Sequence, residues 1–131
     1  MTTKTQEQIE EENKAQEALD QIKAVYQDGY ADINGRRYVF TKANHRKRLR
    51  IFGYFMSIQD RLLANDLSFV ADPDFEEIET LMFGLITYDN SALNKMPMHF
   101  EENDDEKSGD YLVLITVALS VFSYPFLKDK S

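Results

Sequence analysis

The distribution of apolar residues over the first 27 positions predicts a helix that is buried only near its end. Residues 3–27 contain no Gly or Pro and are rich in Glu, Gln, Lys and Ala, which favour helices. The apolar residues that share one helical stripe come late in this segment: Ala15, Ala18, Leu19, Ile22 and Val25 or Tyr26. We therefore expect residues 1–14 to form an exposed acidic helical arm, which is either an inert solvated terminus or a contact for a partner.

An Asn-Gly pair predicts a β-hairpin directly after this helix. Asn34 and Gly35 lie between two short apolar runs, and both tolerate the positive φ values that a two-residue hairpin turn requires. The register follows by counting outward from the turn: Ile33 with Arg36, Asp32 with Arg37, and Ala31 with Tyr38. One face then holds the apolar residues Ala31, Ile33, Tyr38 and Phe40. Because two strands alone are marginally stable, we expect this face to pack on a helix.

Apolar residues then recur at helical spacing from Thr41, the expected N-cap, to about Ala64. From Leu49 onward this segment is apolar on most sides. Its one narrow polar stripe has spacings of four, three, four and four: Arg46, Arg50, Gly53, Ser57 and Arg61. We expect it to be the central core helix, with a basic first turn and a half.

A further helix is predicted from Pro73 to about Thr87. Asp72 is a favourable N-cap, Pro suits the first helical position, and acidic residues follow in the first turns. The residues of its inward stripe are Phe75, Ile78, Leu81 or Met82, and Leu85. Between the two helices, the sequence NDLSFV is a short connection with room for one turn.

The C-terminal part is read as an irregular stretch followed by a buried helix. The irregular stretch from Tyr88 ends in an acidic loop at residues 101–110. The helix starts at the Gly109-Asp110 pair and stops before Pro125. Its apolar run, Tyr111 to Phe122, is about twelve residues long, whereas a membrane span needs roughly 20. No membrane partner is therefore expected.

These elements predict a mainly helical α+β fold with an N-terminal helix, one β-hairpin and about three core helices. We expect a single globular domain at residues 15–127, preceded by the arm and followed by a tail at 128–131. A chain of 131 residues with 43% hydrophobic residues can form such a core without disulfides or metals.

The charge distribution singles out one segment. The chain has a net charge of -8, yet seven of its fifteen basic residues lie between Arg36 and Arg50, and no acid occurs from Ile33 to Gln59. Basic residues at a helix N-terminus oppose the helix dipole, so something must compensate them. Residues 66–110 carry thirteen acids and could match the cluster within the fold. The alternative is a partner-binding surface made of Arg46, Lys47, Arg48 and Arg50.

The residue types argue against catalysis and against metal or cofactor binding. The chain has no Cys, which suits a reducing cytoplasm, and its two histidines, His45 and His99, lack metal-ligand spacing. No nucleophile motif or glycine-rich phosphate loop is present. The acidic balance argues against nucleic acid as a partner. We expect a protein that is not an enzyme, with no cofactor and no metal.

A second candidate contact lies beside the acidic loop. Met96, Met98 and Phe100 could form an adaptable apolar lip, because Met suits surfaces that accept several partners. The alternative is that these three side chains simply cap the core.

The hairpin with Asn34 and Gly35, the following Thr41 and the late segment from Val117 to Pro125 resemble those of lambda-type bacteriophage tail assembly chaperones. This resemblance covers about a third of the chain. It implies a protein that coats the hydrophobic, helical tape measure protein before the tail tube assembles, acts in the host cytoplasm and often self-associates.

Two other classes fit the size and the acidity of the chain. The first is an acidic adaptor or inhibitor that binds one folded protein partner through the N-terminal helix or the basic cluster. The second is a dimeric secretion-type chaperone, whose multi-stranded sheet is not evident in this sequence. A tail chaperone should bind long amphipathic helices and assemble, whereas an adaptor should bind one target at fixed stoichiometry.

Overall fold

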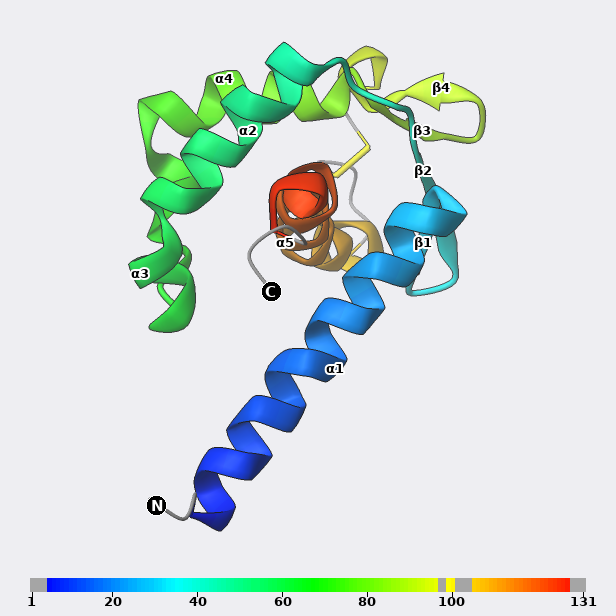
Figure 1. The fold of residues 1–131 in the computed structure, drawn as a ribbon. Helices are drawn as coiled ribbons and strands as arrows, with labels where there is room; N and C mark the ends of the chain where they lie inside the picture. The colour runs from blue at the N-terminus through cyan, green and yellow to red at the C-terminus, as the bar shows by residue number, and fades with distance from the viewer. Residues whose placement is uncertain (1–4, 97–98, 101–104, 128–131) are drawn as a thin grey trace.

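Helices surround one central helix, with a small sheet at one side, in the computed structural model of the protein (Figure 1), which describes residues 5–96, 99–100 and 105–127. The helices are α1 (Gln6–Asp28), α2 (His45–Ser57), α3 (Gln59–Leu63), α4 (Pro73–Phe83) and α5 (Asp105–Leu127), with short 3-10 helices η1 (Leu67–Ala71) and η2 (Leu93–Lys95). The strands are β1 (Tyr30–Ile33), β2 (Arg36–Phe40), β3 (Ile86–Tyr88) and β4 (Ser91–Ala92). The predicted mainly helical α+β class is confirmed.

The first hairpin forms as the sequence predicts. Asn34 and Gly35 have φ values of 52° and 81°, and the three predicted residue pairs between β1 and β2 are all present. The four apolar residues of the predicted face are all buried: Ala31, Ile33, Tyr38 and Phe40. The local turn chemistry therefore sets both the register and the buried face.

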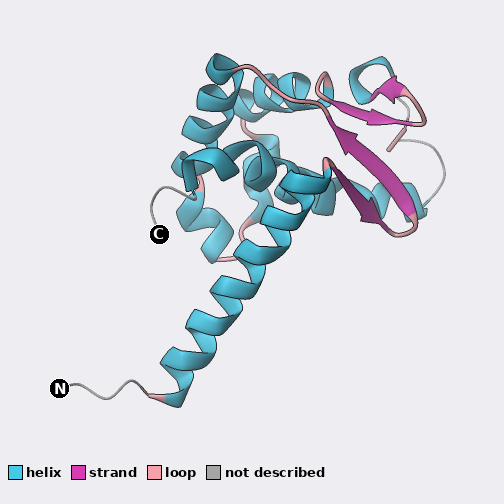
Figure 2. Ribbon diagram, turned by 45° about the vertical axis from the view of Figure 1, so that its right-hand side comes forward, coloured by secondary structure: helices cyan, strands magenta, loops and turns pink. Residues whose placement is uncertain are grey.

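The sheet has four antiparallel strands in the order β1-β2-β3-β4, rather than one hairpin alone (Figure 2). Helix α4 ends at Phe83, so the predicted continuation to Thr87 is wrong. Gly84 ends the helix, and the chain extends at once into β3, which pairs with β2. Asp89 and Asn90, with φ values of 52° and 68°, then make a second tight turn into β4. A second hairpin thus spans the predicted end of this helix and the first residues of the stretch expected to be irregular.

Helix α2 starts later and ends earlier than predicted. Its N-cap is Asn44, whose side chain accepts a hydrogen bond from the Lys47 amide at 2.9 Å. Thr41 instead donates its hydroxyl and its amide to the Leu85 carbonyl, both at 2.8 Å, and so ties β2 to the start of β3. At Ile58 the helix breaks, and α3 follows as a separate turn.

The central helix is α5, seen end-on in the middle of Figure 1, with α2 and α1 packed against it. Its buried residues are Asp110, Leu114, Ile115, Ala118, Leu119, Val121, Phe122, Ser123 and Tyr124. The expectation that the 41–64 segment forms the centre is wrong, because three of its large apolar residues are exposed: Leu49, Met56 and Leu63.

The limits of α5 also differ from the prediction. Residues 105–110 are its first turns and not a loop; residues 101–104 lie outside the described part, as do 128–131. Pro125 lies inside the last turn of the helix. The next residue, Phe126, packs on Phe52 and His45 of α2, with ring centroids 4.9 Å and 5.8 Å apart.

Helix α5 contains the only segment of the described chain, Gly109–Leu127, that is long and apolar enough to cross a membrane by length and composition. Half of that segment is buried within the fold. Since a core helix of a soluble protein meets the same criteria, the finding is weak evidence for a membrane.

Helix α1 projects from the body of the molecule (Figures 1 and 2). Its side chains become half-buried only at Leu19, Ile22 and Val25, and Ile22 and Val25 pack against the core. The described side chains before Leu19 are exposed, including that of Ala18, which the sequence pattern had placed on the buried stripe.

Candidate functional site

The outer face of α2 combines apolar, glycine and basic residues. Leu49 and Met56 are 45% and 41% exposed, and the exposed residues Arg46 and Gly53 lie on the same face at spacings of three and four. Ile51 and Phe55, on the opposite face, are buried against the core. Helix α2 is therefore apolar on both faces, and only one of them is covered by its own chain.

Gly53 is unusual because nothing in the fold requires it. Apart from the adjacent backbone of its own helix, a Cβ atom built at this position meets no atom within 4 Å. Glycine in the middle of a helix costs about 0.5–1 kcal/mol relative to alanine. A small residue between two exposed apolar side chains lets the backbone of a second helix approach closely. We define the α2 surface as Arg46, Leu49, Gly53 and Met56.

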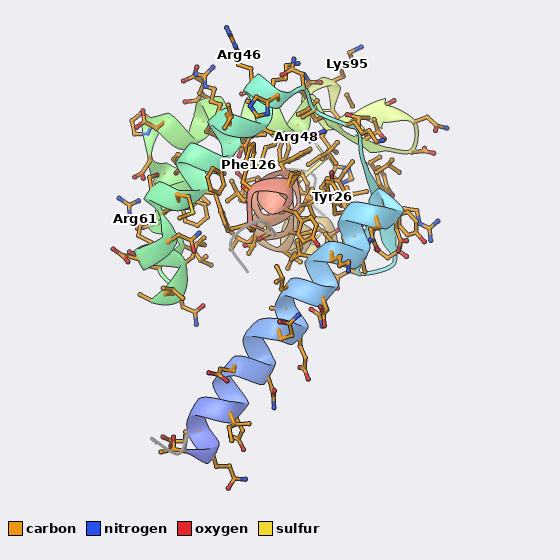
Figure 3. All side chains as sticks on the ribbon, in the orientation of Figure 1. Tyr26, Arg46, Arg48, Arg61, Lys95 and Phe126 are labelled. Carbon is orange, nitrogen blue, oxygen red and sulfur yellow. The ribbon has the colours of Figure 1, made fainter. Side chains whose placement is uncertain are left out.

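One basic residue of α2 forms an ion pair with an acidic side chain of the described chain, and others do not. Arg50 forms an ion pair with Glu77 on α4, as the internal-match hypothesis expects. Arg46, Lys47 and Arg48 have no ion pair within the described part of the chain. Figure 3 shows Arg46 pointing away from the body of the molecule, whereas Arg48 is half-buried. The internal match is thus partial, and positive charge remains at the first turn of α2.

The second predicted contact lies on a different part of the molecule. Met96 and Phe100 are half-buried and pack against the core; Met98 lies outside the described residues. The Phe100 ring packs on the rings of Phe83, His99 and Tyr111. Met96 and Phe100 line a pocket of about 270 Å³ beside α4 and η2, and no basic side chain contributes to it. The structure does not join these residues to the α2 surface.

A buried polar cluster connects the first hairpin to α5. Asp110 is fully buried, and Arg36 donates to its carboxylate from Nε at 2.5 Å and from Nη2 at 3.0 Å. Asn34 donates its side-chain amide at 2.7 Å, and the hydroxyl of the fully buried Tyr38 donates at 2.7 Å. Burial raises the pKa of Asp110, but these hydrogen bonds together lower it to about 2. Asp110 is therefore an ionised carboxylate in the interior.

The cluster extends through Tyr38 to His99. The hydroxyl oxygen of Tyr38 lies 3.0 Å from Nε2 of the buried His99. Tyr38 has one hydroxyl hydrogen, which Asp110 accepts, so Nε2 of His99 carries the hydrogen of this contact. Burial and the neighbouring carboxylate raise the pKa of Tyr38. Because Tyr38 and Asp110 are both fully buried, the cluster holds the hairpin on α5 and offers no open position to a substrate.

This cluster was not predicted from the sequence, where Asp110 was expected in a solvated acidic loop. One signal was available. Alternation along β2 puts Arg36 on the same face as Tyr38 and Phe40, which are the inward residues of that strand. An inward arginine at the end of a buried face requires an acidic partner. The described residues contain no group of three or more His, Asp or Glu side chains that could hold a metal ion.

Comparison of the chain with protein-family models, with curated proteins and with solved structures gives no significant match.

Proposed function

We propose that the protein is a non-enzymatic tail assembly chaperone that binds the tape measure protein during phage tail morphogenesis, in the cytoplasm of the infected host. The observation that carries this proposal is the α2 surface, where Leu49 and Met56 are exposed on either side of Gly53. The resemblance of the Asn34-Gly35 hairpin and the Val117 to Pro125 segment to lambda-type tail chaperones supports the same class. No cofactor, metal or nucleic acid has a role in this proposal.

The α2 surface suits a helical client. A client helix that lies along α2 can place an apolar side chain over Gly53, between Leu49 and Met56, as knobs fit into holes in helix pairs. Arg46 and Lys47 at the first turn of α2 would meet acidic side chains of the client, since both are exposed and without an internal ion pair in the described chain. The net charge of -8 would keep the chaperone and client complex soluble.

The substitution Gly53→Ala separates folding from binding. We expect it to raise the free energy of unfolding by about 0.5–1 kcal/mol, because alanine favours a helix and no atom lies in the way. The same methyl group should weaken capture of the client, because it occupies the space for the partner helix. The measurement pairs urea denaturation with affinity capture from phage-infected cells, followed by mass spectrometry and sizing of the complex.

Gly109→Ala is the matched control. Gly109 also lies inside a helix and is exposed, and a Cβ atom added there meets no atom within 4 Å beyond the adjacent backbone of its own helix. The substitution should stabilise the fold to a similar extent and leave capture unchanged. Equal capture by the wild type and Gly53→Ala would contradict the role of the α2 surface. Recovery of one folded host protein at a one-to-one ratio would contradict the chaperone proposal and would indicate an adaptor or inhibitor instead.

A further inference from the structure

A pocket of about 210 Å³ lies where α1, β2, α2 and α5 meet. Its buried apolar lining includes Phe40, Ala43 and Phe122, and its cationic side chains are Lys42 and Arg48. No acid lines the pocket, and neither cation has an ion pair within the described residues. The volume is below the roughly 300–1,000 Å³ of small-molecule sites, so a single side chain of a protein is the better occupant.

The N-terminal arm of the same chain carries side chains of the complementary kind. Ile9 is 45% exposed and takes no part in the core. Glu7 and Glu10 beside it are exposed, and neither has an ion pair within the described residues. The arm thus presents one large apolar side chain among carboxylates, and the pocket presents an apolar interior with two cations.

The arm cannot reach the pocket of its own chain. Tyr26 lines the pocket and lies seventeen residues after Ile9 in the same helix α1. At about 1.5 Å per residue, the two positions are roughly 25 Å apart. The helix is continuous from Gln6 to Asp28 and projects from the body in Figures 1 and 2, so it cannot fold back. Any contact between the two features must join two molecules.

We infer that the pocket receives Ile9 from the α1 arm of a second copy of this chain, with Glu7 and Glu10 of that arm facing Lys42 and Arg48. Ile9 and Tyr26 lie toward opposite ends of α1, so two antiparallel copies can make the contact twice, in a reciprocal dimer. This contact involves neither the client nor the α2 surface, and it can be tested without either.

Sedimentation velocity of the purified full chain at low salt tests the inference. We expect concentration-dependent self-association of the wild type. Ile9→Ser should weaken it by about a hundred- to ten-thousandfold, because the reciprocal dimer buries Ile9 twice and each buried apolar side chain is worth about ten- to a hundredfold. Val113→Ser is the matched control, since Val113 is 48% exposed on α5, and it should associate as the wild type does. A monomeric wild type, or an unchanged Ile9→Ser, would overturn the inference.

A charge exchange identifies the two surfaces that meet. The variant Glu7→Lys/Glu10→Lys has like charges on arm and pocket, and so has Lys42→Glu/Arg48→Glu. Each should be monomeric alone, and an equal mixture should form a heterodimer. Circular dichroism checks that both variants fold. If Lys42→Glu/Arg48→Glu does not fold, the single variant Lys42→Glu replaces it, because Lys42 is exposed. Association of either variant alone to the wild-type extent, or no association on mixing, would contradict the assignment.

Discussion

Replacement of Asp110 by alanine should lower the free energy of unfolding by about 3–5 kcal/mol, the usual cost of removing one partner from a buried ion pair. Asp110 is fully buried, and the side chain of Arg36 is only 13% exposed. Without the carboxylate, the Arg36 guanidinium loses its two hydrogen bonds and its ion pair to Asp110, and the donors of Asn34 and Tyr38 lose this acceptor. Urea denaturation followed by circular dichroism measures the change.

A loss of this size is a large part of the roughly 5–15 kcal/mol that stabilises a typical domain, and it can leave Asp110→Ala unfolded. Asp110→Asn therefore provides a milder variant. It keeps the shape and one acceptor oxygen but removes the charge that Arg36 requires. The control is Asp32→Asn on β1. Asp32 also accepts two hydrogen bonds from an arginine, Arg37, but the side chains of this pair are 55% and 57% exposed. A similar effect of both substitutions would contradict the buried role of Asp110.

The contribution of Asp110 to the free energy of unfolding should also depend on pH within a defined range. Its pKa is about 2 in the folded protein, against an ordinary value of 3.8. A carboxylate with a lowered pKa stabilises the folded state fully above its unfolded pKa, and this stabilisation is lost as the pH falls through the folded value. The difference in stability between the wild type and Asp110→Asn should therefore be constant above about pH 5 and shrink between about pH 4 and pH 2. A difference that stays constant to pH 2 would contradict this assignment.

Structural features that are determined by residues adjacent in the sequence were predictable. The Asn34-Gly35 turn sets its own backbone geometry, so the strand register and the buried face followed from counting. The start of α4 at Pro73 followed in the same way, because proline is favoured at the first position of a helix. The second hairpin was missed because β3 and β4 are only three and two residues long and depend on pairing with β2.

The candidate surfaces were predictable only in part. The excess of basic residues in the 36–50 segment is evident from composition, but the division between Arg50, which meets Glu77, and Arg46, which meets no acid in the described chain, depends on where α4 packs. The exposure of Leu49 and Met56 could not be read from a segment that is apolar on most sides. Such a pattern shows that a helix is hydrophobic and does not show which face its own chain covers.

The second large effect on stability is expected for a substitution in the central helix α5. Leu119→Ala on α5 should lower the free energy of unfolding by about 2–5 kcal/mol, because Leu119 is fully buried and its removal leaves a cavity among close-packed neighbours. Leu49→Ala on α2 should change it by about 0.5 kcal/mol or less, because that side chain is 45% exposed and its loss opens no cavity.

The two leucine variants make a matched pair, with the same chemical change inside two helices of the same chain. Urea denaturation with equal slopes for the variants and the wild type would show that the differences arise in the folded state. If α2 were the central helix, as its hydrophobicity alone suggests, the order of the two effects would be reversed. A small effect of Leu49→Ala on stability, combined with reduced capture of a client, would show that its exposed side chain serves binding and not folding.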